Sequence, residues 1–465
     1  MSILSTLSIA AQALKAQQLA IQTTGHNLAN AATPGYSRQT VDFVSAHPSF
    51  EGGVILGQGV NVANIQRVVD RFSEAALLDL QAGSGYADAR SQALASIESA
   101  FPTSGGIDAA LSSFFNALAD LSNNPGGTAE RISLIGKANA LGQSLALTRQ
   151  TLGAEQNNLD QNLQGAAQQV NGLVAQIATL NIQISTSEIG GQPANDFRDQ
   201  RQTLLQQLTN LTGATSQEDA SGQVTANVGG LLLVGGNRYA TLKTDTLNSA
   251  GLHAVTYQSP DGSSFDATTL FSQGQIGSLL NLRDSQVPGI IGRLDQFAKT
   301  LVDQVNSQHV LGFDLTGAAG GNFFAPLSAT AGAAANVQVD SAIVADPRRI
   351  AAAAAASTVP GDNRNAQALA TLQSTSFAAL GGLTLEDHFL SLVGDVGSQA
   401  QTADSQAGYQ HALLTQTQAR RESVSGVSID EEMTKLIQFQ RAFESSSLMV
   451  RTADQMYQSL IDMVK

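Results

Sequence analysis

Residues capable of acid–base or metal chemistry are scattered along this chain of 465 residues. Its six histidines lack the spacing of a metal site, and the absence of cysteine excludes thiolate nucleophiles and sulfur-ligated metals. Asp387 and His388 form the one adjacent pair of an acid and a histidine, without an obvious nucleophile beside it. The glycines at 57 and 59 lack the third glycine of a dinucleotide-binding loop. We therefore expect no enzymatic activity, no cofactor and no metal site.

Composition excludes further classes of function. The net charge is −14, which opposes binding to nucleic acid and to anionic lipid. Hydrophobic residues make up 42% of the chain, enough for a sizeable core, yet no stretch is long and apolar enough to span a bilayer. Residues 3–14 are fairly apolar, but no lysine or arginine precedes them, so we do not expect a cleaved signal peptide.

Apolar residues near the start of the chain recur in steps of three and four, the spacing of a helix in a coiled coil. Glycine inside such a helix costs about 1 kcal/mol relative to alanine, so we expect another backbone to approach Gly25 closely. Pro34 and Gly35 suit a tight turn that ends the helix. The residues of this predicted N-terminal seam are Leu4, Leu7, Leu14, Ile21, Gly25 and Leu28.

A second helix with the same spacing is predicted at the other end of the chain. Ser428 and Glu431 have the spacing of a capping box, and the acids at 430–432 lie where the helix dipole favours negative charge. Neither glycine nor proline interrupts residues 427–465. The residues of this predicted C-terminal seam are Met433, Leu436, Phe443, Val450, Tyr457 and Ile461.

Periodicity alone leaves two interpretations of the terminal helices. Each could cover its own part of a globular core, or the two could pair with each other and with copies of themselves. Charge favours pairing, because Lys15 is the only charged residue in 1–33 and most acidic residues of the chain lie outside the two terminal segments. We therefore predict a coiled-coil assembly domain from residues 1–34 and 423–465, through which copies of the chain polymerise.

The middle of the chain indicates a mainly α fold with a smaller inserted β domain. Residues 128–187 keep the three-four alternation with one stutter and predict a single long helix. It belongs to a predicted helical rod domain, 35–211 and 272–422, with an irregular, β-like segment at 313–360. Because so long a helix needs long partners, we expect further helices at 89–100, 107–121, 194–211, 286–310, 366–379 and 384–422. Residues 212–271 alternate short apolar runs with glycine-rich turns, which predicts a small outer antiparallel β domain.

Both ends of the chain resemble one known family. The run from Asn27 to Arg38 and the run from Ser425 to Phe443 are similar to the terminal signatures of bacterial flagellar rod, hook and hook-associated axial proteins. The interior, including residues 195–201, resembles the flagellar hook-associated protein 1 family. The motif residues carried over are Asn27, Asn30, Thr33, Pro34, Gly35 and Tyr36.

The resemblance implies a structural subunit joining the flagellar hook to the filament, outside the cell, after type III export without a cleaved signal peptide. The implied partners are other copies in a ring or helical polymer, hook protein, the next hook-associated protein, and an export chaperone on the C-terminal helix. The alternative is a hook or distal-rod protein of the same family. Asn27 and Asn30, one helical turn apart, could bond between subunits or cap the helix end.

Overall fold

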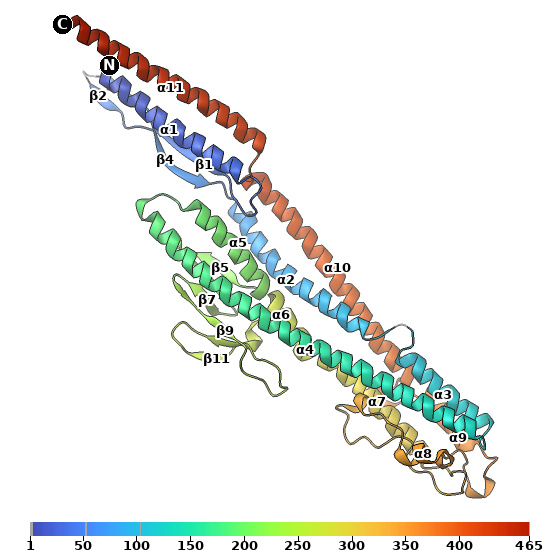
Figure 1. The fold of residues 1–465 in the computed structure, drawn as a ribbon. Coiled ribbons are helices and arrows are strands. Elements are labelled where there is room, and N and C mark those ends of the chain that lie inside the picture. The colour runs from blue at the N-terminus through green and yellow to red at the C-terminus, as the bar shows by residue number, and fades with distance from the viewer. Residues whose placement is uncertain (1–2, 52–53, 103, 465) are drawn as a thin grey trace.

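The computed structural model describes residues 3–51, 54–102 and 104–464 and shows an elongated helical molecule (Figure 1). The two chain ends lie together at one tip, and the long helices run from there toward the opposite end. The predicted fold class, mainly α with a small inserted antiparallel β region, is confirmed.

Helix α4 (Thr128–Ser187) forms the rod and has the bounds that its periodicity predicted. Its apolar seam is buried along the whole length, from Leu134 through Leu159 to Ile184. The helices packed along it bury one continuous core with it. They are α3 (Ile107–Asn123), α5 (Asn195–Thr212), α6 (Gly274–Asn281) and α7 (Val287–His309).

Helices α2 (Arg71–Ser99) and α10 (Leu385–Ser425) form a long antiparallel pair that connects the rod to the chain ends (Figure 1). Helix α2 begins well before the predicted 89–100. The helix predicted at 366–379 is shorter than expected. Helix α9 (Arg364–Thr371) ends at Thr371, and two 3-10 turns follow it at 372–374 and 378–380.

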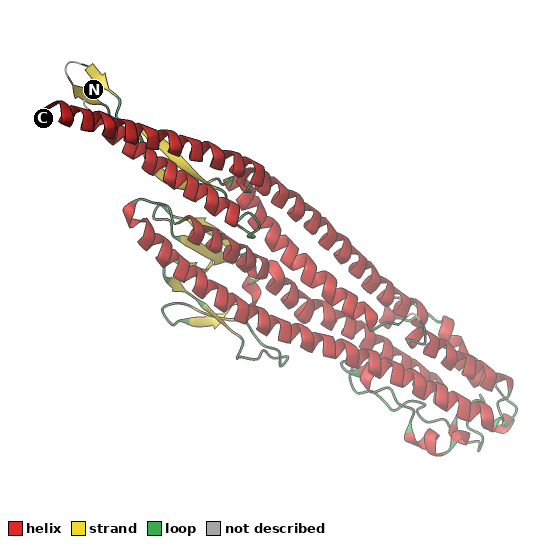
Figure 2. Cartoon of the chain, turned by 45° about the horizontal axis from the view of Figure 1, so that its top comes forward, coloured by secondary structure: helices red, strands yellow, loops and turns green. Residues whose placement is uncertain are grey.

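The inserted β region lies along one side of α4 in two small antiparallel sheets (Figures 1 and 2). Two asparagines of α4 attach the sheets to the rod through hydrogen bonds to the backbone of the strands. The Asn171 amide donates to the Leu242 carbonyl of one sheet at 2.8 Å, and the Asn181 amide donates to the Val224 carbonyl of the other at 2.9 Å. One sheet contains β5 (Thr215–Glu218), β6 (Val224–Val228), β7 (Leu231–Gly235) and β8 (Arg238–Tyr239). The other contains β9 (Thr241–Lys243), β10 (Thr256–Gln258) and β11 (Ser264–Asp266).

A buried charge cluster fixes the base of the β region. Arg283, in a π-helical turn at 282–286, is 0% exposed and donates to Asp160 Oδ1 at 2.7 Å and to the His253 carbonyl at 2.6 Å. His253 Nδ1 lies 2.5 Å from Asp160 Oδ2. Burial alone would raise the pKa of Asp160, but the bonds from His253 and Arg283 outweigh it and hold that pKa below its usual value.

Residues 313–360 have an irregular course, with isolated bridges and short helical turns such as α8 (Ser341–Ala345). Side chains from the rod bind its backbone. Arg131 of α4 donates to the carbonyls of Ile350 and Pro125, both at 2.6 Å, and His309 accepts from the amide of Ala351 at 2.9 Å. Burial lowers the pKa of both side chains.

Four strands follow the first helix, in a region where we predicted only the helical rod. Strands β1 (Gln39–Ser45) and β4 (Val60–Arg67) pair antiparallel with a register shift between Asp42 and Phe43. They pack against α1 (Ile3–Ala29). Strands β2 (Ser49–Glu51) and β3 (Val54–Leu56) extend the connection between them as a short hairpin.

The terminal helices α1 and α11 (Ile429–Val464) lie antiparallel, side by side, beyond the end of the rod (Figures 1 and 2). Of the two interpretations of these helices, the structure therefore shows pairing with each other.

Candidate assembly surface and its junction with the rod

Small and polar side chains, rather than the predicted seams, make the contact between α1 and α11. Several buried residues of the two helices precede a predicted seam residue by one position, as Ala20, Thr24 and Asn27 do on α1 and Glu432 does on α11. One residue is a rotation of about 100° around a helix, so the predicted seams lie beside the contact instead of in it. The buried residues of the two helices are Ala10, Ala16, Ala20, Thr23, Thr24 and Asn27 on α1, and Glu432, Ser446 and Ala453 on α11.

The predicted seams remain largely uncovered in the single chain. Leu4 is 68% exposed and Tyr457 is 52% exposed, although both are large apolar side chains. Leu7, Met433, Phe443 and Ile461 are also exposed, whereas Leu14, Ile21, Leu28, Leu436 and Val450 are half-buried. Two apolar stripes thus lie side by side along the tip of the molecule.

Gly25 lies on this uncovered side of α1. A Cβ atom built at Gly25 would have no other atom within 4 Å, so the expected close approach of another backbone is absent within the described part of this single chain.

Asn27 joins the two chain ends through four hydrogen bonds of its buried side-chain amide. Its Nδ2 donates to the Gln39 carbonyl at 2.8 Å and to Glu432 Oε2 at 2.9 Å. Its Oδ1 accepts from the Tyr36 hydroxyl at 2.8 Å and from the Gln39 amide at 2.9 Å. All four bonding positions of the amide are used within one chain, so Asn27 acts as an internal brace.

The rest of the N-terminal motif shapes the loop that leaves α1. Asn30 Nδ2 donates to the His26 carbonyl at 3.0 Å and so caps the end of the helix, which is the second of the two alternatives for these asparagines. Gly35 has a φ of 81°, and a Cβ there would lie 2.5 Å from Thr203 Oγ1 of α5. Glycine therefore lets the loop approach α5 closely.

A buried arginine holds the corner between α10 and α11. Arg421 Nε donates to Glu74 Oε1 of α2 at 2.6 Å, and its Nη2 donates to the Gly35 carbonyl at 2.9 Å. The Arg38 amide donates to the Ser425 carbonyl at 2.8 Å beside it. The terminal helices are thus attached to α2 and α10 through a buried ion pair and through hydrogen bonds to backbone carbonyls.

Two acids of the 195–201 run bind the same loop from α5. Asp199 accepts from the Ser37 amide at 2.8 Å and from Arg67 at 2.7 Å, while burial raises its pKa against the opposing effect of Arg67. Asp196 accepts from Gln39 Nε2 at 2.7 Å and lies 3.3 Å from His26 Nε2. Burial, followed by the charges of these two acids, raises the pKa of Tyr36. The sequence marked both runs as motifs without indicating that they meet.

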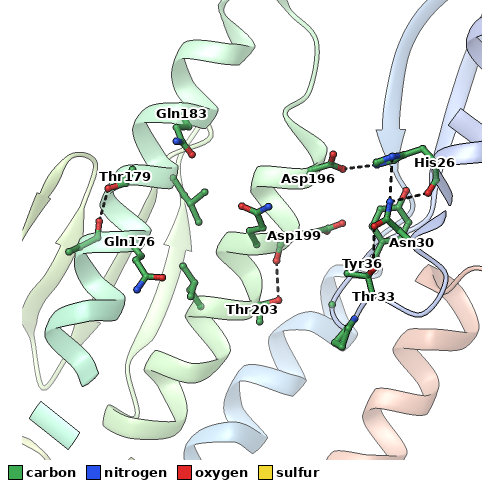
Figure 3. Close-up of a pocket in the computed structure, with 16 residues that line it drawn as sticks. His26, Asn30, Thr33, Tyr36, Gln176, Thr179, Gln183, Asp196, Asp199 and Thr203 are labelled. Atoms are coloured by element: carbon green, nitrogen blue, oxygen red, sulfur yellow. Dashed lines mark hydrogen bonds and ion pairs between the residues drawn. The ribbon is translucent and has the colours of Figure 1, made fainter. Parts of the chain in front are cut away.

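A groove of about 730 Å³, which we call the junction groove, is lined by this loop, the end of α1, α4 and α5 (Figure 3). Pro34, Leu180 and Leu204 contribute apolar surface to its lining. The acidic residues in the lining are Asp196 and Asp199, and His26 lines the groove beside them.

The residues singled out for possible chemistry have structural partners. Asp387 Oδ2 accepts from Thr384 Oγ1 at 2.8 Å at the start of α10, and His388 faces the Arg293 carbonyl at 3.4 Å. Glu431 pairs with Arg38 at 3.2 Å, so the acids at 430–432 do more than favour a helix start.

Among residues 3–51, 54–102 and 104–464, no group of three potential metal ligands occurs, and no helix is long and apolar enough to cross a membrane.

Three family models match the chain. The model described as "Flagellar hook-associated protein FlgK helical domain" matches residues 94–324. Models described as "Flagella basal body rod protein" and "Flagellar basal body rod FlgEFG protein C-terminal" match residues 7–36 and 419–463. The interior and both ends thus carry separate family signatures.

Relatives align over nearly the whole chain. Flagellar hook-associated protein 1 of Bacillus subtilis is 29% identical, covering 98% of this chain and 97% of its own. The protein of that name from Escherichia coli is 26% identical, covering 98% and 99%. The structure of the flagellar hook junction protein FlgK from Burkholderia pseudomallei has a TM-score of 0.67 at 17% identity, over 76% of this chain and 100% of that chain, and shows the same fold.

Proposed function

We propose, from the premise that this chain belongs to the flagellar hook-associated protein 1 family, that its terminal helices polymerise with those of neighbouring copies to join hook to filament. Members of this family are structural proteins of the bacterial flagellum. The chain is thus an exported flagellar component, and the remaining question is which surfaces build the assembly.

The observation that carries the proposal is the pair of apolar stripes on α1 and α11. The two helices already pair through small residues, so their larger side chains, such as Leu4 and Tyr457, remain in water. Burying an exposed leucine or phenylalanine contributes roughly 1.5–3 kcal/mol, and each copy presents several such residues in a continuous row. Neighbouring copies with the same stripes supply a matching apolar surface.

The proposal extends to further partners and to export. Hook protein and the next hook-associated protein would pack against the same terminal helices from either side of the ring. The exposed stripe on α11, which includes Met433 and Ile461, suits an export chaperone before assembly. Passage through the type III channel, without removal of a signal peptide, would deliver the chain outside the cell.

The alternative of a hook or distal-rod protein is not favoured. The ends match rod-protein models, but the interior matches the helical domain of hook-associated protein FlgK over residues 94–324. Helices α4, α5 and α7 fill that interior.

Electron microscopy of purified hooks tests the proposal. We expect the full-length chain to add a defined layer at one end of each hook and to permit growth of filament from it once the other filament components are supplied. Hooks incubated with buffer alone are the control. Binding along the side of the hook, or no binding at all, would contradict the proposed junction.

A further inference from the structure

The most exposed large apolar side chain among the described residues is Phe72, at 86%. It lies in the first turn of α2, where its amide donates to Asp70 Oδ1 at 3.0 Å, so its backbone is held while the ring projects into water. Arg71 beside it is also exposed and, within the part of the chain that the structure describes, makes no ion pair. Single exposed apolar residues are common, but a fixed aromatic ring beside an unpaired guanidinium forms a distinct projecting group.

The Arg71–Phe72 pair and the junction groove lie beside the same part of α5, but on different sides of the molecule. Glu74, two residues after Phe72, is buried and accepts from Gln202 Nε2 of α5 at 2.8 Å. Thr203, the next residue of α5, lines the groove. Two residues correspond to about 200° around a helix, so Phe72 points away from α5 while Glu74 faces it.

The groove complements this pair in both shape and charge. Pro34, Leu180 and Leu204 offer an apolar surface to a ring, within a volume of about 730 Å³. Asp196 lies in the groove lining with its side chain 55% exposed, so a carboxylate oxygen is accessible to an incoming guanidinium. Among the residues that the structure describes, no lysine or arginine lines the groove.

We propose that the Arg71–Phe72 pair of one copy inserts into the junction groove of the next copy, with the ring on the apolar lining and the guanidinium on Asp196. The proposal rests on the polymerisation proposed above and adds a second contact outside the terminal helices. A projection and a groove on different faces of one chain make a head-to-tail contact, which builds rings or helices. The contact would fix the rotation between neighbouring copies at the level of the junction.

Cross-linking between two single-cysteine variants tests the contact, because the natural chain contains no cysteine. One variant carries Phe72→Cys, and the other carries Gln200→Cys, at an exposed residue that lines the groove. Mixing the two excludes a bond within one chain. The matched control is Gln168→Cys, at an exposed glutamine of α4 outside the groove lining.

We expect a short bis-maleimide to link the first two variants when they are bound together on purified hooks, and not in dilute solution. The Gln168→Cys control should stay unlinked. Phe72→Ala should raise the concentration needed to saturate hook ends by roughly tenfold, because one aromatic ring is no longer buried. The control is Leu147→Ala, which shortens an exposed leucine of α4 outside the groove lining and should leave this concentration unchanged.

The outcomes separate the two proposals. If wild-type chain binds hook ends but Phe72→Cys fails to link to Gln200→Cys, or links to hook protein instead, the groove contact is wrong and the proposed function stands. Unchanged binding of Phe72→Ala also overturns the contact. If the wild-type chain does not bind hook ends, the proposed function fails and the contact fails with it.

Discussion

The side-chain amide of Asn27 donates a hydrogen bond of 2.9 Å to Glu432, a residue 405 positions later in the chain. The carboxylate of Glu432 is buried, and its other oxygen accepts from Lys435 at 2.8 Å. A buried carboxylate needs such partners, because an unpaired one costs several kcal/mol. This bond therefore couples the end of α1 to the start of α11.

Asn27→Ala should release α11 from α1 without unfolding the rod. The substitution removes four hydrogen bonds and leaves Glu432 with Lys435 alone, so we expect a local loss of about 2–4 kcal/mol. Hydrogen exchange should accelerate in 3–29 and 429–464 and stay unchanged in 128–187. Asn157→Ala, at an exposed asparagine of α4, is the control. Equal protection of α11 in both variants would contradict the brace.

Arg421→Met should destabilise the corner between α10 and α11. The substitution leaves the buried carboxylate of Glu74 without its charged partner, which costs about 3–5 kcal/mol of folding stability. The double variant Glu74→Met with Arg421→Met should recover part of that loss, because it leaves no unpaired charge. Denaturant unfolding of the single and double variants measures this coupling. Losses that simply add would show that the pair is not coupled.

Gly25→Ala should have opposite effects on the single chain and on the polymer. Alanine favours a helix by about 1 kcal/mol over glycine, and nothing lies within 4 Å of the new methyl group, so α1 should become more protected from exchange in the monomer. If a neighbouring copy approaches Gly25, the same methyl group should weaken binding to hook ends. Unchanged hook binding would show that no backbone approaches there.

Leu14→Asp and Phe443→Asp should each abolish assembly while leaving the rod folded. Each places a carboxylate in a stripe that copies are proposed to bury, which costs several kcal/mol. Circular dichroism tests the fold of the monomer, and electron microscopy of hooks tests assembly. Leu147→Asp, at an exposed leucine of α4, should assemble normally. Filament growth with Phe443→Asp would show that the C-terminal seam is misplaced.

Acid should loosen the base of the β region through Asp160. Its pKa is lowered in the folded chain, so the ionised carboxylate stabilises the fold above the unfolded value of about 3.9. That contribution is lost as the pH falls from there through the folded pKa. Asp160→Asn should unfold more easily at neutral pH, and its deficit relative to wild type should shrink as the pH falls below about 4, the unfolded pKa of aspartate. A deficit independent of pH would contradict this role.

Long periodic elements could be predicted from the sequence, and contacts between distant segments could not. Helix α4 follows its periodicity because 60 residues keep one apolar seam. The helix predicted at 366–379 ends early, since Phe377 forms a bridge with Leu383 instead. The sequence does not predict strands β1 and β4, because polar residues such as Asn61 and Asn64 interrupt a short alternation of apolar and polar residues.

The terminal seams show why periodicity identifies a surface but not its partner. Large apolar side chains mark the stripe that includes Leu4 and Tyr457, whereas the buried faces of the two helices include small residues such as Ala20 and Ala453. Small residues carry little hydrophobic signal, yet they allow two helices to approach closely. The meeting of the 27–38 and 195–201 runs could not be predicted either, because its bonds link residues such as Ser37 and Asp199 across 162 positions.

The antiparallel pairing of α1 and α11 brings the first described helix of the chain against the last one. Closing a contact between segments so far apart in sequence costs more chain entropy than closing a contact between neighbouring helices such as α3 and α4. We therefore expect the tip of the molecule to form after the rod during folding. A chain cut short before α11 would keep its rod and leave α1 without the helix that it packs against within one chain.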